Sequence, residues 1–399
     1  MKNNIIIPFL SILYLLHSVP ALGILYPSSL YALLVVVLFL ILTYKVGVKN
    51  IVSIMPIFII PILNIVIIGN MSVVTIAERI SGILQSLILP LLYIYIRIYN
   101  RLKLGNQLFV IYVVMTLITC ITTYIGYDVF PDASRELASL DNDSSVYRTY
   151  MKLNIGGFSF IYTLVLLNIL VICSIKNYKL FKKGISVAMF NILFLIIIGL
   201  VIYKSQYTTA ILIYSISLLF LLAGRRFNFK YITTLICIGI IIFLVYRTPI
   251  AEKMELLSEK VESYDVSERL YDLSRFLVGE YTSDYSDLDA RGHTYMTSLN
   301  TFLNNPFGVW NNRGNGGHSF VFDNMARFGI LGVALVIIML YKLYRLYISP
   351  IHNSNIYGYA CVLLTIYILL AVVNPHIFTN VLMFVLPLYY LNDINKYSI

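Results

Sequence analysis

Charged residues are scarce in this sequence. Only 12% of its 399 residues are Asp, Glu, Lys or Arg, whereas 59% are hydrophobic and the mean hydropathy is +0.83. A soluble domain carries about 25% charged residues, so this composition excludes an ordinary soluble protein. The apolar residues occur in repeated blocks of roughly 17 to 23, long enough to cross a bilayer as helices. The blocks are uniformly apolar rather than alternating, which disfavours membrane-spanning strands.

Motifs for nucleotide- or metal-dependent chemistry are also missing. The sequence contains no Walker motif, no HExxH, no paired CxxC and no GxSxG. Its four cysteines lie inside apolar blocks at a spacing that matches no metal knuckle or disulfide framework, and we interpret them as small apolar filler: Cys120, Cys173, Cys237 and Cys361. We therefore expect no cofactor and no metal ion.

The apolar blocks predict an all-α, polytopic membrane protein of about twelve transmembrane helices. The predicted spans are residues 5–25, 29–45, 51–69, 80–98, 107–127, 153–175, 185–203, 206–223, 231–247, 319–341, 355–373 and 376–391. Residues 1–247 then hold spans one to nine, with a short external loop at 128–152. A long external loop follows at 248–318, and residues 319–399 hold the last three spans. The first block looks like a signal peptide, but no clear cleavage pattern follows it, so we interpret it as an uncleaved span.

The basic residues predict the orientation of the chain. With both termini in the cytosol, the cytosolic segments hold 16 of the 29 basic residues and one of the 19 acidic residues. Such an excess of Lys and Arg is typical of cytosolic loops. The high isoelectric point is therefore a sign of topology, and no basic and aromatic surface indicates nucleic acid binding.

The long external loop is predicted to be helical rather than disordered. Apolar residues recur at helical spacing in 249–266, where Pro249 suits a helix start. Further helices are expected over 268–280 and 291–303, the last ended by Asn-Asn-Pro at 304–306. Amphipathic helices here would lie on the bilayer surface over the mouth of the bundle. A purely structural lid is the alternative.

One stretch, GNGGHSFVFDNMARFGILG at 314–332, concentrates polar residues at the start of an apolar helix. His318 and Ser319 open the helix, and Asp323 and Arg327 lie one turn apart within it, where they can pair. Ionisable groups at membrane depth normally face a cavity or each other. An imidazole suits general base chemistry near neutral pH. The alternative is a structural cluster at a helix start.

Among the basic residues predicted on the external side, against the general trend, four stand out. Arg291 opens a helix just after an acidic turn, Arg148 precedes a span, Arg135 lies in the short external loop, and Lys204 lies in a tight turn. An anionic lipid head group would explain them, because a guanidinium can grip a phosphate with two hydrogen bonds. Pairing with nearby acids and ordinary snorkelling are the alternatives.

The second half of the chain resembles a known family. An arginine opening a helix that runs to NNPFGVW, followed by GGHSFVFDNMARFGILG, is similar to the O-antigen polymerases (Wzy type) and to the related O-antigen ligases. The sequence likeness covers residues 291–332, and the hydropathy likeness covers the whole chain. His318 is followed directly by Ser319, which looks more like the polymerases than the His-Asn-Ser common in ligases.

The resemblance implies a metal-independent glycosyltransferase of the bacterial inner membrane. Such an enzyme transfers the growing glycan from undecaprenyl pyrophosphate to the non-reducing end of the next lipid-linked repeat unit, at the outer face. By position, His318 would activate the acceptor hydroxyl, Arg291 would hold the pyrophosphate, and Arg148 would contact a phosphate or sugar. The family often has an arginine in the turn after the seventh span. This chain has SQYTTA at 205–210 instead, and Lys204 cannot reproduce a guanidinium fork.

Two other functions remain open from the sequence. A ligase would use the same donor but transfer the glycan to lipid A core or to protein. A flippase or other transporter of lipid-linked oligosaccharides would do no chemistry, but it is expected to show internal repeats and polar groups at mid-membrane. The implied partners are the lipid bilayer, the undecaprenyl-pyrophosphate-linked oligosaccharide and a chain-length regulator protein.

Overall fold

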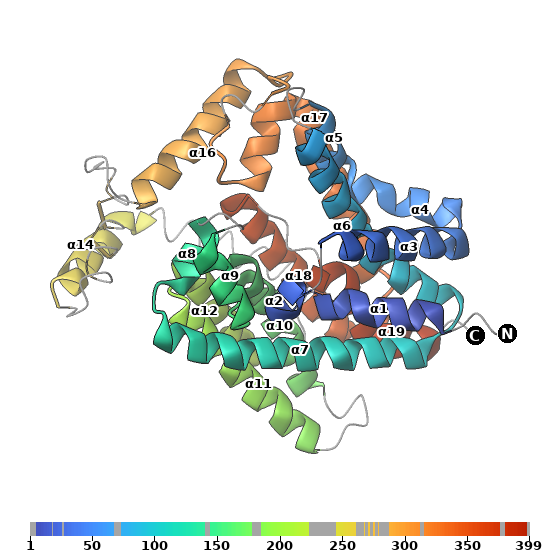
Figure 1. The fold of residues 1–399 in the computed structure, drawn as a ribbon. Coiled ribbons are helices and arrows are strands. Elements are labelled where there is room, and N and C mark those ends of the chain that lie inside the picture. The colour runs from blue at the N-terminus through green and yellow to red at the C-terminus, as the bar shows by residue number, and fades with distance from the viewer. Residues whose placement is uncertain are drawn as a thin grey trace. The chain divides into compact units, whose positions relative to one another are not determined.

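The computed structural model describes residues 5–17, 19–25, 28–67, 73–139, 144–177, 185–222, 245–260, 267, 270–271, 274–275, 278, 287–311, 315–375 and 380–396. Every regular element in these residues is helical (Figure 1), so the all-α prediction is confirmed. The chain divides into two compact units, each described by itself. Unit 1 comprises Met1–Arg226, Ile338–Tyr367 and Phe378–Ile399, and unit 2 comprises Phe227–Ile337 and Ile368–Ile377.

Six of the described helices are long and apolar enough to cross a membrane. They are Ser29–Val46, Leu102–Val129, Phe158–Lys176, Val187–Lys204, Phe320–Ile348 and Ser354–Val373. Shorter apolar helices accompany them at Ile6–His17, Val48–Ile57, Gly82–Ile98, Thr208–Leu218 and Val381–Leu391. Because about 20 apolar residues in helix match the hydrocarbon thickness, the chain is a membrane protein whose surroundings include a lipid bilayer.

Unit 1 holds most of these helices. In chain order they are α1 (Ile6–His17), α2 (Pro20–Leu25), α3 (Ser28–Val46), α4 (Val48–Ile54), the short turn η2 (Met55–Ile57), α5 (Ile59–Ile67), α6 (Val73–Ile98), α7 (Leu102–Val129), α8 (Ala133–Ser139), α9 (Ser145–Lys152), α10 (Phe158–Lys176), α11 (Ile185–Lys204) and α12 (Thr208–Leu222). The C-terminal part adds the π-helical turns η3 (Tyr344–Ile348) and η4 (Val381–Val385), α19 (Leu386–Lys396) and most of α18 (Ser354–Val373).

The helix α10 is the most buried of the six long apolar helices. Within the protein, 72% of its membrane-length window is buried, compared with 22% for α3 and 33% for α7 and for α11. It packs against α11 and α12, while α3 packs along α6 (Figure 1). A helix that is apolar on all sides suits such a buried place. The less buried helices keep apolar surface for lipid.

Two predicted spans are divided into shorter helices, which corrects their description as single helices. The segment predicted at 5–25 forms α1 and α2, and Pro20 is the first residue of α2. The segment predicted at 51–69 contains the end of α4, then η2 with Pro56, then α5 with Pro61 in its first turn. Proline has no N–H to donate to the preceding turn, so it tends to start a helix or interrupt one.

Unit 2 holds the helices predicted for the long external loop. They are α14 (Arg247–Ser258) and α16 (Asp287–Asn304), followed by the first part of α17 (Phe320–Leu343). Pro249 lies in the first turn of α14, as expected, and α16 covers the predicted helix 291–303 and ends where Asn-Asn-Pro was expected to end it. The described residues between 267 and 278 are helical too. Of the predicted ninth span, residues 231–244 lie outside the described residues.

Candidate functional site

A buried carboxylate fixes the turn that precedes α17. Asp323 is only 4% exposed. Its Oδ1 accepts hydrogen bonds from the Ser298 hydroxyl at 2.7 Å and from the Gly317 N–H at 3.2 Å. Its Oδ2 accepts from the Ser319 N–H at 3.2 Å. Because Ser298 belongs to α16, one carboxylate joins α16, the turn and the start of α17.

The start of α17 is capped from both directions. Ser319 is fully buried, and its Oγ accepts a hydrogen bond from the Phe322 N–H at 3.1 Å. The backbone N–H of Ser319 in turn donates to the Asp323 carboxylate. Such reciprocal bonds satisfy donors that a helix start otherwise leaves unpaired. The buried Ser298 hydroxyl accepts a further bond from the Gly316 N–H at 2.8 Å. The backbone from Gly316 to Ser319 is therefore tied at three of its four N–H groups.

Two glycines let this turn pass close to α16. A Cβ placed on Gly316 would lie 2.1 Å from the Thr294 carbonyl oxygen, a distance that no side chain can occupy. Gly317 has φ +78°, in the left-handed region that favours glycine. The Gly-Gly pair before His318 is therefore a steric requirement of the turn rather than a flexible linker.

His318 lies exposed at the end of this fixed turn, one residue before the helix cap. The next residues are tied to the end of α18: the Phe320 N–H donates to the Asn374 carbonyl at 2.8 Å. The Tyr295 hydroxyl of α16 donates to the Val373 carbonyl at 3.0 Å. An accessible imidazole on an immobilised backbone at a helix N-terminus can exchange a proton with a substrate and lies where anions are favoured.

The helix α17 is broken at Gly329, a feature that the sequence patterns did not predict. Gly329 has φ 60° and ψ −141°, outside the helical region. The loop after α16 fills the break: Ile330 N–H donates to the Pro306 carbonyl at 2.8 Å, and Trp310 N–H donates to the Arg327 carbonyl at 2.9 Å. The two quoted motifs, NNPFGVW and ARFGILG, are thus in direct backbone contact.

Glycine is required on both sides of this contact. A Cβ on Gly329 would lie 2.1 Å from the Pro306 carbonyl oxygen, and a Cβ on Gly308 would lie 2.4 Å from the Arg327 carbonyl oxygen. Both residues have a positive φ, +60° and +84°, which favours glycine. The two glycines are therefore the only trace of the break that the sequence carries. The loop therefore holds the first three turns of α17 against the end of α16.

The two arginines predicted for this region lie on the same elements. Arg327 is half-buried on α17, one turn after Asp323. Arg291 lies in the first part of α16, seven residues before Ser298, which is two turns or about 10.5 Å along the helix axis. Its side chain lies outside the described part of the structure. The backbone thus brings Arg291, His318, Ser319, Asp323 and Arg327 into one unit.

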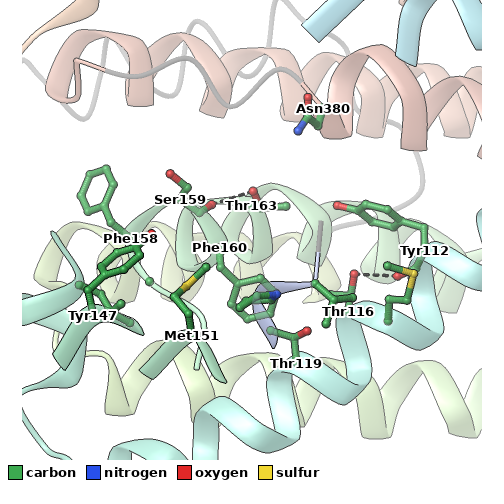
Figure 2. Close-up of a pocket in the computed structure, with 15 residues that line it drawn as sticks. Tyr112, Thr116, Thr119, Tyr147, Met151, Phe158, Ser159, Phe160, Thr163 and Asn380 are labelled. Carbon is green, nitrogen blue, oxygen red and sulfur yellow. Dashed lines mark hydrogen bonds between the residues drawn. The ribbon is translucent and has the colours of Figure 1, made fainter. Parts of the chain in front are cut away.

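Unit 1 has a cavity of about 340 Å³ that the sequence did not indicate (Figure 2). Hydroxyl and aromatic groups dominate its wall. The lining residues are Val19, Pro20, Tyr112, Met115, Thr116, Thr119, Leu137, Tyr147, Met151, Gly157, Phe158, Ser159, Phe160, Thr163 and Asn380. Uncharged hydroxyls beside aromatic rings are the groups that bind sugar rings and neutral polar ligands. The wall carries no ionisable acid or base apart from two tyrosines.

One wall of this cavity is set by a link, Asn154–Gly157, between α9 and α10. Asn154 is buried at φ 58°, and its side-chain amide donates to the Thr122 hydroxyl at 3.0 Å. The Gly156 N–H donates to the Thr123 hydroxyl at 2.7 Å, and the Tyr127 hydroxyl donates to the Gly156 carbonyl at 2.7 Å. Because this link is not helical, the span predicted at 153–175 begins later, at Phe158.

Arg135 and Arg148 lie on α8 and α9, two short helices anchored to the same end of unit 1. The Ser134 hydroxyl donates to the Ser205 carbonyl at 2.9 Å, which holds α8 to the turn between α11 and α12. The Tyr150 hydroxyl of α9 donates to the Glu136 carboxylate of α8, and this bond raises the pKa of Tyr150 to about 12. Both arginines are exposed, and Arg148 is adjacent to the cavity-lining Tyr147.

Lys204 ends α11 and is already paired. Its ammonium bonds to the Asp128 carboxylate of α7 and lies 3.5 Å from the centre of the Tyr124 ring. The following turn is tight, because α12 begins at Thr208 and Gln206 has φ 57°. The structure thus brings Lys204, Arg135 and Arg148 to one end of unit 1, with the charge of Lys204 balanced by a carboxylate.

No protein-family model, no curated protein and no solved structure matches this chain. The residues themselves therefore carry the functional evidence. They form two groups, one around the turn before α17 and one around the hydroxyl-lined cavity. Sequence patterns indicated the first group, apart from Ser298, and gave only Arg135, Arg148 and Lys204 of the second. Uncharged lining residues such as Ser159 carry no motif by which a sequence can be searched.

Proposed function

We propose that this protein is a polymerase of lipid-linked oligosaccharides, similar to the O-antigen polymerases. It transfers the growing glycan from undecaprenyl pyrophosphate to the non-reducing end of the next lipid-linked repeat unit. The observation that carries the proposal is the fixed turn: Asp323 ties down the backbone on both sides of His318 and leaves the imidazole exposed. A general base must be accessible and held in place.

The proposed reaction needs a base and a cation. His318 takes the proton of the acceptor hydroxyl as its oxygen attacks the anomeric carbon of the donor. The bond from that carbon to the pyrophosphate oxygen breaks, and undecaprenyl pyrophosphate leaves with its electron pair. Arg291 is assigned to the charge that develops on the leaving group, because a guanidinium matches the geometry of phosphate oxygens. No nucleotide or metal ion takes part.

The hydroxyl-lined cavity of unit 1 is assigned to the repeat unit. Its wall of Tyr147, Ser159 and Thr163 offers hydrogen bonds and ring faces to a neutral sugar. Arg148 and Arg135, on the two short helices beside it, are assigned to phosphate or acidic sugar groups. Lys204 serves better as the structural partner of Asp128, since its charge is already balanced.

The topology proposed with this function has twelve spans, both termini in the cytosol, and residues 248–318 at the outer face of a bacterial inner membrane. The six long apolar helices and the five shorter ones are compatible with it. Its support is the distribution of Lys and Arg along the sequence. Cysteine labelling from outside intact cells checks it: a cysteine replacing Glu252 should react and one replacing Lys49 should not.

A deletion strain tests the function directly. We expect loss of the polymeric glycan ladder with one capped repeat unit retained on the surface acceptor. Loss of all surface glycan would overturn the proposal, because a ligase or a flippase acts on every unit. The plasmid-borne wild-type gene must restore the ladder.

Within that strain, His318→Ala tests the proposed base. The variant should insert normally, as judged by membrane immunoblotting, and fail to restore the ladder. His293→Ala is a matched control, since it removes another exposed histidine of unit 2 from α16. Full ladders with His318→Ala would remove His318 from the mechanism.

A further inference from the structure

A second polar cavity lies at the C-terminal end of α6, in unit 1. It has a volume of about 330 Å³ and is lined by α4, the last two turns of α6 and η3. Asn50, Ser53 and Arg97 supply its polar groups, while Ile54, Ile94 and Leu346 supply apolar wall. The proposed function uses none of these residues, and the cavity is separate from the hydroxyl-lined one, with which it shares no lining residue.

Two tyrosines of this cavity carry buried hydroxyls that form no hydrogen bond with the residues that the structure describes. Tyr93 is 2% exposed and Tyr347 is fully buried, and neither hydroxyl has a hydrogen-bond partner among the described residues. A buried donor without an acceptor is costly, and native structures rarely keep one without a reason. An acceptor-rich ligand in the cavity would satisfy them.

The cavity lies in a region of one charge sign. Arg97 lines the cavity and is exposed, and its guanidinium and the Tyr390 hydroxyl lie near the Tyr93 hydroxyl without forming a hydrogen bond of acceptable geometry with it. Lys49 and Arg345 are the chain neighbours of the lining residues Asn50 and Leu346. No acidic residue occurs in the segments 45–54, 93–103 or 342–348. This combination of a guanidinium fork and unpaired hydroxyl donors is suited to a phosphate group.

We infer that this cavity binds the phosphate head group of an anionic phospholipid. Phosphate oxygens would accept hydrogen bonds from Arg97 and from the two tyrosine hydroxyls. The apolar wall of Ile54, Ile94 and Leu346 favours a lipid over a free anion, because acyl chains can cover it. Basic pockets between membrane helices are suited to such head groups.

Thermal unfolding of the full-length protein in an uncharged detergent tests the inference. Dioleoylphosphatidylglycerol should raise the unfolding midpoint, because a ligand that binds only the folded state stabilises it. Dioleoylphosphatidylcholine, with the same chains and no net charge, should raise it much less. For Arg97→Gln the phosphatidylglycerol concentration at half-effect should rise roughly tenfold.

Arg101→Gln is the matched control, since Arg101 lies four residues further on and does not line the cavity. If Arg101→Gln raised the phosphatidylglycerol concentration at half-effect as much as Arg97→Gln does, the lipid would be attracted by the general positive charge, and the specific site would be overturned. Equal stabilisation by phosphatidylcholine, which carries the same phosphate but no net charge, would overturn the preference for an anionic lipid. An equal effect of inorganic phosphate would overturn the assignment to a lipid.

Tyr93→Phe tests the unpaired hydroxyl separately. Without lipid the variant should be as stable as the wild type or slightly more stable, because it removes a buried donor that has no partner. Its response to phosphatidylglycerol should weaken severalfold. Destabilisation of the lipid-free variant would show that the Tyr93 hydroxyl has a protein partner, and would overturn its assignment to a bound phosphate.

Discussion

Two irregular segments each lead into a long apolar helix, and they are held in different ways. Before α17, the turn Gly316–Ser319 is tied by a buried carboxylate and a serine of another helix. Before α10, the link Asn154–Gly157 is tied by a neutral amide and by threonine hydroxyls of α7. Hydrogen bonds to a charged group are roughly twice as strong as neutral ones.

The difference matches what each segment presents. The turn before α17 presents one exposed ionisable group, His318, and proton transfer depends on its exact place. The link before α10 forms part of a cavity wall of many uncharged groups, among them Gly157 and Ser159. Recognition of a sugar by many hydroxyls tolerates small shifts, whereas a single base does not. We therefore expect substitutions in the turn before α17 to reduce activity more than substitutions in the link before α10.

The largest effect is expected for Asp323→Asn. An amide keeps the size of the side chain but replaces one acceptor oxygen by an NH₂ group, which must face a backbone or hydroxyl donor. The free energy of unfolding should fall by about 3 kcal/mol, because buried donors lose their acceptor, and the glycan ladder should disappear. Thermal unfolding in detergent and complementation measure the two effects.

The exposed carboxylate Glu252 of α14 provides the control, and Glu252→Gln should change neither property. If Asp323→Asn restored full ladders, the fixed turn would have no role in activity.

The next largest effect is expected for Gly329→Ala. The added Cβ would meet the Pro306 carbonyl, and the residue would have to keep a positive φ. Backbone strain and displacement of the loop together should lower the free energy of unfolding by about 2 kcal/mol. Gly82→Ala is the control, because a Cβ there meets nothing within 4 Å on the helix α6, and it should be neutral or slightly stabilising. Equal stability of the two variants would contradict the observed backbone contact.

The all-helical class of this protein and several of its long apolar helices could be predicted from the sequence, and the reason is physical. Membrane-length apolar blocks such as 29–45 and 107–127 can only be helices, because backbone groups in lipid must bond within their own segment. The helix 291–303 and the polar start of α17 carried equally local signals, namely apolar spacing and polar residues at the start of an apolar helix. The sequence also shows Pro20, Pro56 and Pro61, but whether a proline bends a span or divides it depends on the helices packed around it.

The contacts within the candidate site could not be predicted in the same way. Asp323 and Arg327 lie one turn apart on the helix and were predicted to be able to pair, but no local pattern indicated that the Asp323 carboxylate accepts a hydrogen bond from Ser298, 25 residues earlier. The broken helix at Gly329 depends on a loop that arrives from α16. Long-range pairings of this kind leave no periodicity in one sequence, and a serine inside a polar helix carries no sign of its partner.

A smaller effect is expected for Asn154→Ala in the link before α10. The variant loses the bond to Thr122 and places alanine at φ 58°, so the free energy of unfolding should fall by about 1 to 2 kcal/mol. Asn154→Gly separates the two causes, since it keeps the backbone conformation and loses only the bonds. Ladders should shorten rather than vanish with Asn154→Ala. A loss as complete as that of Asp323→Asn would remove the proposed difference between the segments.

The smallest effect is expected for Tyr150→Phe, which removes one hydrogen bond between α9 and α8. Near pH 7 it should lower the free energy of unfolding by about 1 kcal/mol.

The bond to Glu136 raises the pKa of Tyr150 to about 12 from an ordinary value near 10. A raised pKa in the folded state means that the stabilisation is complete below pH 10 and is lost as the pH rises toward 12. The difference in unfolding free energy between wild type and Tyr150→Phe should therefore stay constant up to about pH 9 and shrink above pH 10. Glu136→Gln should flatten this dependence, because its neutral amide raises the tyrosine pKa less than a carboxylate does. A difference that grew with pH would mean that the hydroxyl is not held by the carboxylate, and α9 would then owe its place to packing alone.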